Sequence, residues 1–170
     1  MEYKGKYPFP PILKDVAKDL ASLRTALSKD VYKEGTEKHR GKDEEAISYL
    51  GILAEMVARN FLIVGEVEHT AALLVDLKPV VEPDIVLFDG KTIDVKGVKP
   101  YSKRFYVNKK AHDNIDKKCD FYWFVLLMNF EVAAEHYIIS HKKVSEWKVE
   151  KLKYTDAYVY DIPKEKEIKL

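Results

Sequence analysis

The longest uninterrupted apolar stretch in this 170-residue chain covers residues 121–128, and it is only eight residues long. A membrane-spanning helix needs roughly 20 apolar residues, so this stretch is far too short to cross a bilayer as a helix. A short apolar run rich in aromatic side chains is typical of a strand that is buried on both faces. We therefore expect residues 121–128 to form a central strand of a covered sheet.

A hairpin is expected a little earlier in the chain. Residues 85–88 are apolar, and the dipeptide Asp89-Gly90 that follows them is a strong signal for a turn between two strands. Residues 92–96 then alternate between polar and apolar side chains, which is the period of a half-buried strand.

Two amphipathic helices are expected before this hairpin. The first follows Pro8, Pro10 and Pro11, and its helically spaced apolar residues are Ile12, Val16, Leu20, Leu23 and Leu27. The second begins after Asp43, a candidate N-cap, and ends at Gly65. Its apolar stripe consists of Ala46, Leu50, Leu53, Val57 and Phe61. The charged residues 29–42 between the two helices predict a loop.

The rest of the chain contains shorter signals. Residues 66–82 predict one strand and an irregular excursion, residues 106–118 predict a short polar helix, and the charged tail 164–170 is expected to fray. Strands are also expected at residues 136–140 and 157–160, and a turn or short helix at residues 142–147. Because helices and strands alternate, the predicted fold class is α/β, with a mixed central sheet flanked by helices.

Length and composition favour one domain at residues 1–170, since a chain of this size can bury a core without disulfides. Within it we distinguish an N-terminal helix and charged loop (1–42), a core that carries the motifs (43–128), and C-terminal strands with a tail (129–170). The net charge is only +1, so there is no global basic surplus that would by itself indicate nucleic-acid binding.

The expected compartment is the cytoplasm, and no membrane partner is expected. The single cysteine, Cys119, cannot form an internal disulfide, which points to a reducing compartment. Residues 1–11 lack the apolar segment of a signal peptide. Cys119 enters an apolar strand and is expected to be a buried thiol rather than a nucleophile.

Three acidic residues and one lysine are candidates for a catalytic site. Glu55 lies on the second predicted helix, Asp84 follows Pro83 at the start of the first hairpin strand, and Asp94 and Lys96 lie on the second. Divalent ions such as Mg²⁺ prefer carboxylate oxygens and water as ligands. A lysine beside two carboxylates can hold or deprotonate an attacking water, and it offsets the repulsion between the acids. Such a group is suited to hydrolysing a phosphodiester.

The spacing of these residues in a strand supports this interpretation. Asp94 and Lys96 are two residues apart, so they project from the same face about 7 Å apart, while Ile93 and Val95 point into the core. A strict two-residue turn at Asp89-Gly90 would place Asp84 opposite Val95, on the wrong face. We therefore predict either one extra loop residue or a bulge, which pairs Asp84 with Lys96, or an Asp84 that lies beyond the regular ladder.

The motifs Pro83-Asp84 and Asp94-Val95-Lys96, with Glu55 on the preceding helix, resemble those of the PD-(D/E)XK nuclease superfamily over residues 43–128. This resemblance implies a restriction-endonuclease-like fold and a Mg²⁺- or Mn²⁺-dependent endonuclease that hydrolyses DNA by in-line attack of water and leaves a 5′-phosphate. It also implies the roles of the residues. Asp84 and Asp94 would bind the metal with help from the Val95 carbonyl, Lys96 would act on the water, and Glu55 would bind the metal or its water.

Glu55 is the weakest of these assignments, because it lies off the apolar stripe of its helix and could equally be an ordinary surface glutamate. Glu44 and Glu45, earlier on the same helix, are the substitutes. For Asp94 and Lys96, the alternative is a solvated strand face.

The segment 96–118 is locally basic, with eight Lys or Arg residues against two Asp. The residues expected to contact nucleic acid are Lys99, Lys103, Arg104, Asn108, Lys109 and Lys110. The aromatic residues Tyr101, Phe105 and Tyr106 are interleaved with them, and His112 is a further candidate for reaching the phosphate. The alternative is a set of solvated surface lysines. The loop at residues 39–42 is a second candidate for nucleic-acid contact.

Three functions remain open at this level. A restriction-like endonuclease is the first, a Holliday-junction-resolving enzyme of the same superfamily is the second, and a non-catalytic module that binds nucleic acid or protein is the third. An enzyme of this size that cuts both strands would do so most easily as a symmetric homodimer.

Overall fold

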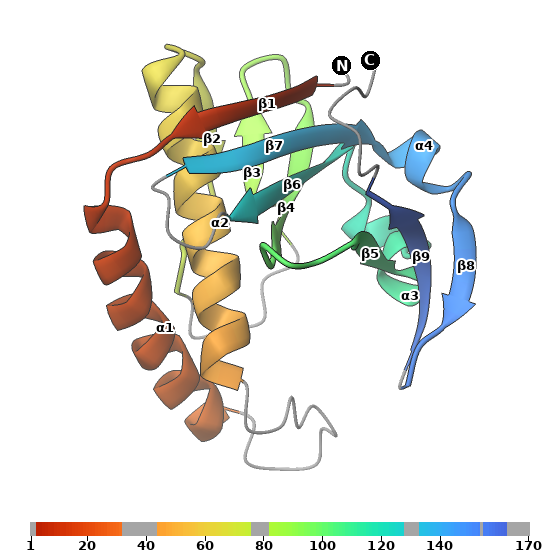
Figure 1. Cartoon of the computed structure of the whole chain (residues 1–170), viewed down its shortest axis with the longest axis horizontal. Coiled ribbons are helices and arrows are strands. Elements are labelled where there is room, and N and C mark those ends of the chain that lie inside the picture. Colours follow the sequence, from red (N-terminus) through yellow and green to blue (C-terminus); the bar gives the residue numbers. More distant parts are fainter. Residues whose placement is uncertain (1–2, 32–43, 76–81, 128–132, 154, 163–170) are drawn as a thin grey trace.

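The structure is a computed structural model that describes residues 3–31, 44–75, 82–127, 133–153 and 155–162. It is a mixed α/β fold with two sheets (Figure 1). The strands are β1 (Tyr3–Pro8), β2 (His69–Ala71), β3 (Ile85–Leu87), β4 (Thr92–Val98), β5 (Arg104–Asn108), β6 (Phe121–Leu127), β7 (Ala133–Ser140), β8 (Lys148–Lys151) and β9 (Asp156–Asp161). The helices are α1 (Ile12–Val31), α2 (Glu44–Val64), α3 (Lys109–His112), α4 (His141–Val144) and the short 3₁₀ helix η2 (Ile115–Lys117).

The larger sheet has the strand order β1-β7-β6-β4-β3-β2, and β6 lies at its centre. β6 pairs in parallel with β4 and antiparallel with β7, so the sheet is mixed. Six of the seven β6 residues are buried, which confirms the central strand predicted from the apolar run. Successive β6 side chains enter two different cores, because Trp123 packs on one face of the sheet and Phe124 on the other.

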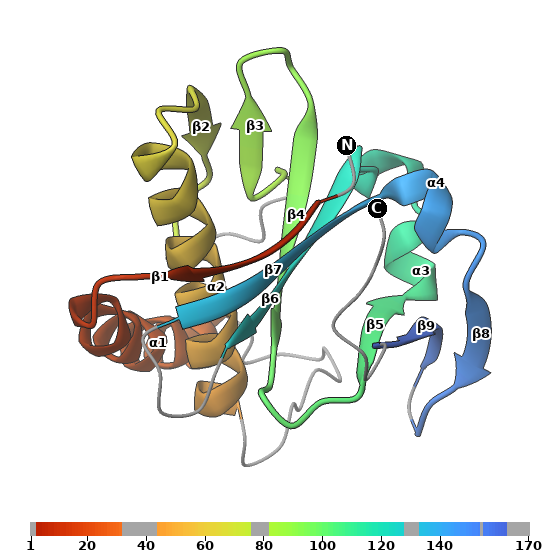
Figure 2. The same cartoon turned by 45° about the horizontal axis from the view of Figure 1, so that its top comes forward.

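The helices α1 and α2 cover one face of this sheet (Figures 1 and 2). Both were predicted from their apolar spacing, although α1 extends to Val31, into the stretch expected to be a loop. By length and composition alone, Glu45–Val64 could cross a membrane. In the fold, the buried face of this helix packs against β4, β6 and α1, so the protein's own core accounts for much of its apolar character.

The smaller sheet has the order β5-β9-β8 and covers the opposite face of β6. Its contact with the larger sheet is aromatic: Phe105 of β5 stacks on Phe124 of β6, with ring centroids 4.3 Å apart. The single polar helix predicted for residues 106–118 is therefore wrong in its first part. Residues up to Asn108 are strand, because Phe105 and Val107 alternate into the core, and the helix starts only at Lys109.

The turn between β3 and β4 has three residues, Phe88 to Gly90. Leu87 and Lys91 close it, with the Leu87 N–H donating to the Lys91 carbonyl at 2.8 Å, and Gly90 adopts a φ of 81°. A three-residue loop that ends in a left-handed glycine is a common hairpin connection. The prediction that the turn is not a simple two-residue hairpin is confirmed. The extra residue precedes the dipeptide, however, so continuing the ladder places Asp84 opposite Asp94 rather than Lys96.

Several smaller expectations have clear outcomes. The sequence signals missed β1 and β8, while the strands and short helix expected between residues 136 and 160 are present. Helix α2 ends at Val64, but the left-handed residue that follows is Glu66, with a φ of 55°, rather than Gly65. The loop at 32–42, the candidate cap Asp43, the excursion at 76–81 and the tail 164–170 lie outside the described residues.

Candidate active site

Asp84 lies immediately before β3, where β3 and β4 stop pairing. Two rungs join these strands, Ile85 with Ile93 and Val86 with Thr92, and beyond them the edge of β4 has no β3 residue beside it. The Asp84 side chain occupies this position, because its Oδ2 accepts a hydrogen bond of 2.6 Å from the N–H of Val95. The carboxylate is thereby fixed at the edge of β4, next to Asp94.

Asp94 and Lys96 project from one face of β4, as their spacing predicted. Lys96 Nζ donates to Asp94 Oδ1 at 2.5 Å, and both side chains are about one-third exposed, at 39% and 31%. The alternate residues Ile93 and Val95 are buried against the helices. Asp84 thus stands on the same edge as a lysine–carboxylate pair that is open to solvent.

The surroundings of Asp84 and Lys96 change how readily each is charged. Burial and the charge of the neighbouring Asp94 carboxylate together raise the pKa of Asp84 to about 6, while Lys96 and the Val95 N–H act in the opposite direction. Burial disfavours the charged form of Lys96, but the Asp94 and Asp84 carboxylates outweigh this effect, so the pKa of Lys96 is raised above its ordinary value. Lys96 is therefore an ammonium ion at neutral pH.

Glu55 is buried, with only 8% of its surface exposed, so the alternative of an ordinary surface glutamate is wrong. Its pKa is raised to about 7, first by burial and then by the Asp84 charge, against the opposing effect of Arg24, Arg59 and Lys96. Arg59 lies one helical turn away, with its Nη2 3.7 Å from the Glu55 Oε2. The buried face of α2 is wider than the predicted stripe, because α1 covers one side of the helix and the sheet covers the other.

A glycine on β4 sets how closely α2 approaches the site. A Cβ added to Gly97 would overlap the backbone carbonyl of Leu50, while a Cβ on Gly51 would meet nothing within 4 Å. The strand therefore supplies the glycine at this contact, and the close approach brings α2, which carries Glu55, near β4.

The substitutes for Glu55 are not brought to this site. Glu45 is exposed and accepts a hydrogen bond of 2.5 Å from Ser22 of α1. The side chain of Glu44 lies outside the described residues.

The donor chemistry of the site fits a hard divalent cation. Within the part of the chain that the structure describes, no group of three or more His, Cys, Asp and Glu side chains is arranged to hold a metal ion. Mg²⁺ is commonly bound by one or two carboxylates, with water and substrate phosphate completing the shell. Asp84 and Asp94, with the Val95 carbonyl, match this smaller set, and Glu55 is placed to bind a metal-bound water.

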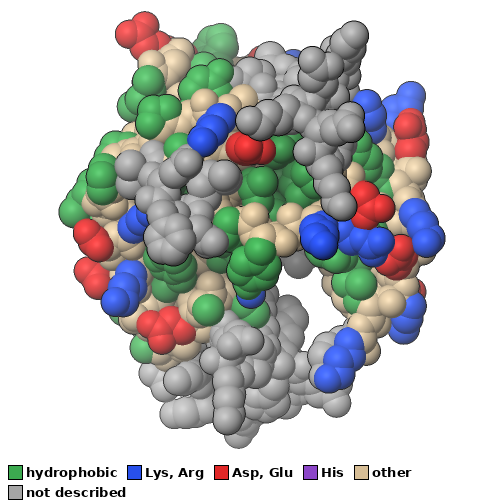
Figure 3. Space-filling view, viewed as in Figure 1, with side chains coloured by type: hydrophobic (Ala, Val, Ile, Leu, Met, Phe, Trp, Pro, Cys, Tyr) green, Lys and Arg blue, Asp and Glu red, His purple; other side chains and the backbone are tan. Residues whose placement is uncertain are grey.

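Several side chains of the basic segment, residues 96–118, form ion pairs or hydrogen bonds within the protein. Four of its candidate nucleic-acid contacts are exposed: Lys99, Lys103, Asn108 and Lys110. Arg104 is held by two carboxylates, since its Nη1 lies 2.9 Å from Glu150 Oε2 and its Nε lies 2.5 Å from Asp161 Oδ1. Figure 3 shows Lys and Arg side chains mixed with Asp and Glu over the side of the molecule that carries β5, β8 and β9.

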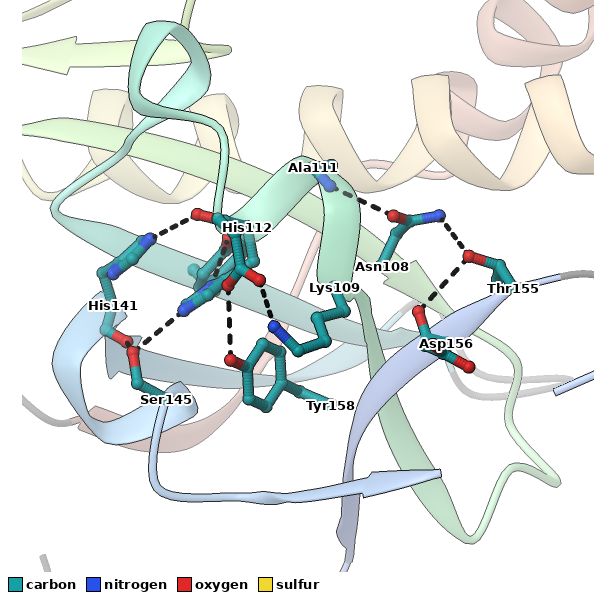
Figure 4. Close-up of polar contacts among 11 residues, drawn as sticks. Asn108, Lys109, Ala111, His112, His141, Ser145, Thr155, Asp156 and Tyr158 are labelled. Atoms are coloured by element: carbon teal, nitrogen blue, oxygen red, sulfur yellow. Dashed lines mark hydrogen bonds and ion pairs between the residues drawn. The ribbon is translucent and has the colours of Figure 1, made fainter. Parts of the chain in front are cut away.

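Two further candidates have structural partners around α3 (Figure 4). Asn108 caps this helix, because its side chain accepts a hydrogen bond from the Ala111 N–H at 3.1 Å and its Nδ2 donates to Thr155 at 3.1 Å. Lys109 forms an ion pair with Asp113 one turn later. Both side chains stabilise the junction of β5, α3 and β9.

His112 cannot reach a phosphate, because it is buried and both ring nitrogens are hydrogen-bonded (Figure 4). Nδ1 lies 3.0 Å from the Tyr122 hydroxyl and Nε2 lies 2.9 Å from Ser145 Oγ, while the ring stacks on His141 at 3.7 Å. Burial lowers the pKa of His112 to about 4, so the ring is neutral at pH 7.

Sequence reasoning missed a support beneath Asp94. Tyr122 is its partner on β6, and Tyr122 and Cys119 are buried in the same core under the smaller sheet. Cys119 is buried, as expected, and burial raises the pKa of its thiol to about 12. Only the parallel register of β4 and β6 brings these residues together, and a single sequence carries no signal for that register.

Lys96 also borders a part-open cavity of about 310 Å³. Its walls come from α2, the end of β4, the loop after it, β5 and β6. The lining residues are Leu50, Lys96, Gly97, Val98, Lys99, Tyr101, Ser102, Arg104, Tyr106 and Phe124. We call it the Tyr101 cavity.

Comparison with known proteins adds no assignment. The chain matches no protein-family model and no curated protein. The case for a function therefore depends on the geometry described above.

Proposed function

We propose that this protein is a metal-dependent phosphodiesterase that hydrolyses DNA, a Mg²⁺- or Mn²⁺-dependent endonuclease of the PD-(D/E)XK type. The observation that carries the proposal is that the Asp84 carboxylate, bonded to the Val95 N–H, lies on the same stretch of β4 as the Asp94–Lys96 pair. Neighbouring carboxylates repel each other, and a divalent cation bound to both would remove that repulsion.

The finer fold assignment, restriction-endonuclease-like, belongs to the same proposal. A helix that carries Glu55 precedes an antiparallel hairpin that carries Asp84, Asp94 and Lys96, and this is the order of the superfamily motifs. The buried position of Glu55 and the shared edge of Asp84 and Asp94 support the assignment.

Each residue has a distinct task in the proposed hydrolysis. Asp84, Asp94 and the Val95 carbonyl would hold the cation, which when bound would polarise the phosphate and lower the pKa of a coordinated water. Lys96, which is charged at neutral pH, holds the attacking water and stabilises the negative charge that develops on the phosphate oxygens. Glu55, whose pKa of about 7 suits proton transfer near neutral pH, takes the proton of that water.

DNA as the substrate class is supported by the charges that surround the site. Lys96 and Lys99 border one cavity, and Lys103 and Lys110 are exposed on the following segment. Phosphate groups bind to such lysines through charge, without any requirement for a base sequence.

The proposal is tested by incubating the purified protein with labelled duplex, single-stranded and four-way-junction DNA in Mg²⁺, in Mn²⁺ and in EDTA. We expect cleavage only with a metal. Asp94→Ala should slow it at least a hundredfold, about 3 kcal/mol, because a metal ligand is lost.

A matched control is available on the same hairpin. Asp89 forms an ion pair with Lys91 at 2.5 Å, with the same two-residue spacing as Asp94 and Lys96, but it lies at the exposed turn. Asp89→Ala is expected to retain wild-type cleavage. Equal cleavage by wild-type protein and Asp94→Ala would contradict the proposed site, and binding without cleavage in either metal would favour a non-catalytic module.

The same assay separates the two nuclease types. A junction-resolving enzyme cleaves the four-way junction in preference to linear duplex, while a restriction-like enzyme cleaves the duplex. A symmetric homodimer would present one site to each strand, and sedimentation of the protein with and without DNA tests this.

A further inference from the structure

The Tyr101 cavity begins at a residue of the proposed active site and extends away from it. Lys96, which pairs with Asp94, contributes to its wall, and Phe124 and Leu50 contribute apolar surface. Its volume of about 310 Å³ is at the lower end of the roughly 300–1,000 Å³ of small-molecule pockets. A cavity of this size suits a single flat group attached to the phosphate that the site would hold.

Two aromatic rings at this cavity are not used by the core. Tyr101 is 70% exposed and Tyr106 is 44% exposed, and neither is in ring-to-ring contact with another of the described residues. Phe105, which lies between them in sequence, is fully buried and stacks on Phe124. Phe105 therefore stabilises the fold, whereas the rings of Tyr101 and Tyr106 are exposed and can stack on a ligand.

The charges around the cavity favour a ligand that carries phosphate. Lys99 is exposed, has its Nζ 5.9 Å from the centre of the Tyr101 ring, and forms no ion pair with another described residue. Arg104 is neutralised by Glu150 and Asp161, so it fixes the wall rather than attracting the ligand. Lys96 is likewise paired with Asp94, so the positive charge that a ligand would meet without a described ion-pair partner lies at Lys99.

We propose, on the basis of the proposed function, that the Tyr101 cavity receives one unpaired nucleobase of the DNA strand that is cut, next to the phosphate held at Asp84 and Asp94. A base inside a duplex is stacked on both sides and must be extruded before it can enter such a cavity, which costs least where the base is already unpaired. The preferred substrate class is therefore DNA with an unpaired nucleotide beside the cleavage position, rather than perfectly paired duplex.

Three duplexes test this proposal: one perfectly paired, one with a single unpaired nucleotide, and one in which that nucleotide is abasic. In Mn²⁺, we expect the wild-type protein to cleave the second in preference to both others. Stacking of one base on one aromatic ring corresponds to a change of about 5- to 150-fold in binding. Tyr101→Ala should lose a factor of this size on the unpaired duplex only, while Tyr101→Phe should retain the preference.

The control variant is Phe88→Ala. Phe88 is an aromatic residue that is 84% exposed in the β3–β4 turn and does not line the cavity. It should leave the preference for the unpaired nucleotide unchanged. If the duplexes with the base and with the abasic site are cleaved equally, or if Tyr101→Ala keeps the wild-type preference, the proposal is overturned.

Binding measured in EDTA separates this proposal from the proposed function. A wild-type protein that binds the unpaired base more tightly than the abasic site, with the difference lost in Tyr101→Ala, supports the cavity even if no metal produces cleavage. Cleavage that depends on Asp94 but shows no preference for an unpaired base retains the nuclease and rejects the cavity. Absence of binding to all three duplexes, together with absence of cleavage, rejects both.

Discussion

Asp84 and Glu55 are acidic residues that the fold buries near one another. Burial is the main cause of the raised pKa of both carboxyl groups, and the Asp84 charge contributes to the raised pKa of Glu55. Neither property was visible in the sequence. The motif identified Asp84, but its burial depends on the departure of β3 from β4, and the burial of Glu55 depends on a glycine of a distant strand. The sequence was enough to name these two residues as candidates, whereas their burial and raised pKa values could be found only from the fold.

The raised pKa values predict how the stability of the metal-free protein depends on pH. In EDTA, the folded state keeps protons on Asp84 up to about pH 6 and on Glu55 up to about pH 7, while the unfolded chain loses them near 3.8 and 4.5. The folded state therefore binds more protons in this window, and the free energy of unfolding should fall as pH rises from about 4 to about 7. Urea unfolding across this range measures the effect.

Substitutions at these two positions check the cause. Glu55→Gln and Asp84→Asn should weaken the pH dependence and stabilise the metal-free protein near pH 8 by an amount on the order of 1 to 3 kcal/mol, since a buried charge is removed. Glu45→Gln, an exposed position on the same helix, should keep the wild-type slope. A slope that all three variants share with wild type would show that other groups set it.

At the scale of elements, local patterns predicted α1, α2, β3, β4 and β6, and they failed where partners lie far apart in the chain. β1 pairs with β7, more than a hundred residues away, and between the paired strands β4 and β6 the chain forms β5, α3 and η2. Arg104–Asn108 alternates like a strand, with Phe105 and Val107 buried, but the polar residues that follow led to the prediction of a helix from residue 106. Short-range periodicity does not specify which strands pair.

The contact between α2 and β4 provides an element-scale prediction. Gly97→Ala forces a Cβ against the Leu50 carbonyl, a backbone group that cannot rotate away, so we expect a loss of about 1 to 3 kcal/mol of stability and displacement of Glu55 from the site. Gly51→Ala is the matched control, since its Cβ meets nothing within 4 Å, and in a helix interior it should stabilise by about 0.5 to 1 kcal/mol. Thermal unfolding and the cleavage rate measure both variants. Equal stability of the two variants would contradict the close approach.

For the whole molecule, the two cores lie on opposite faces of the sheet that carries the proposed site. The core under α1 and α2 contains Ile93 and Val95, and the core under the smaller sheet contains Tyr122 and Cys119. Asp94 and Lys96 therefore stand on a strand that is packed from both sides, which restricts their movement. Because only the complete fold holds these acids near one another, a ligand that binds them should increase the free energy of unfolding.

This linkage predicts that metal stabilises the folded protein. A cation that binds only the folded state adds about 2.7 kcal/mol at a concentration a hundred times its Kd, so Mn²⁺ and Mg²⁺ should raise the Tm of the wild-type protein. Because protons on Asp84 and Glu55 compete with the cation, the increase should be larger near pH 8 than near pH 5. Asp84→Asn and Asp94→Ala should abolish it, while Asp89→Ala, at the exposed turn, should retain it. A Tm that rises equally in all four proteins would mean that the metal binds elsewhere, and the convergence of Asp84 and Asp94 would then serve the fold alone.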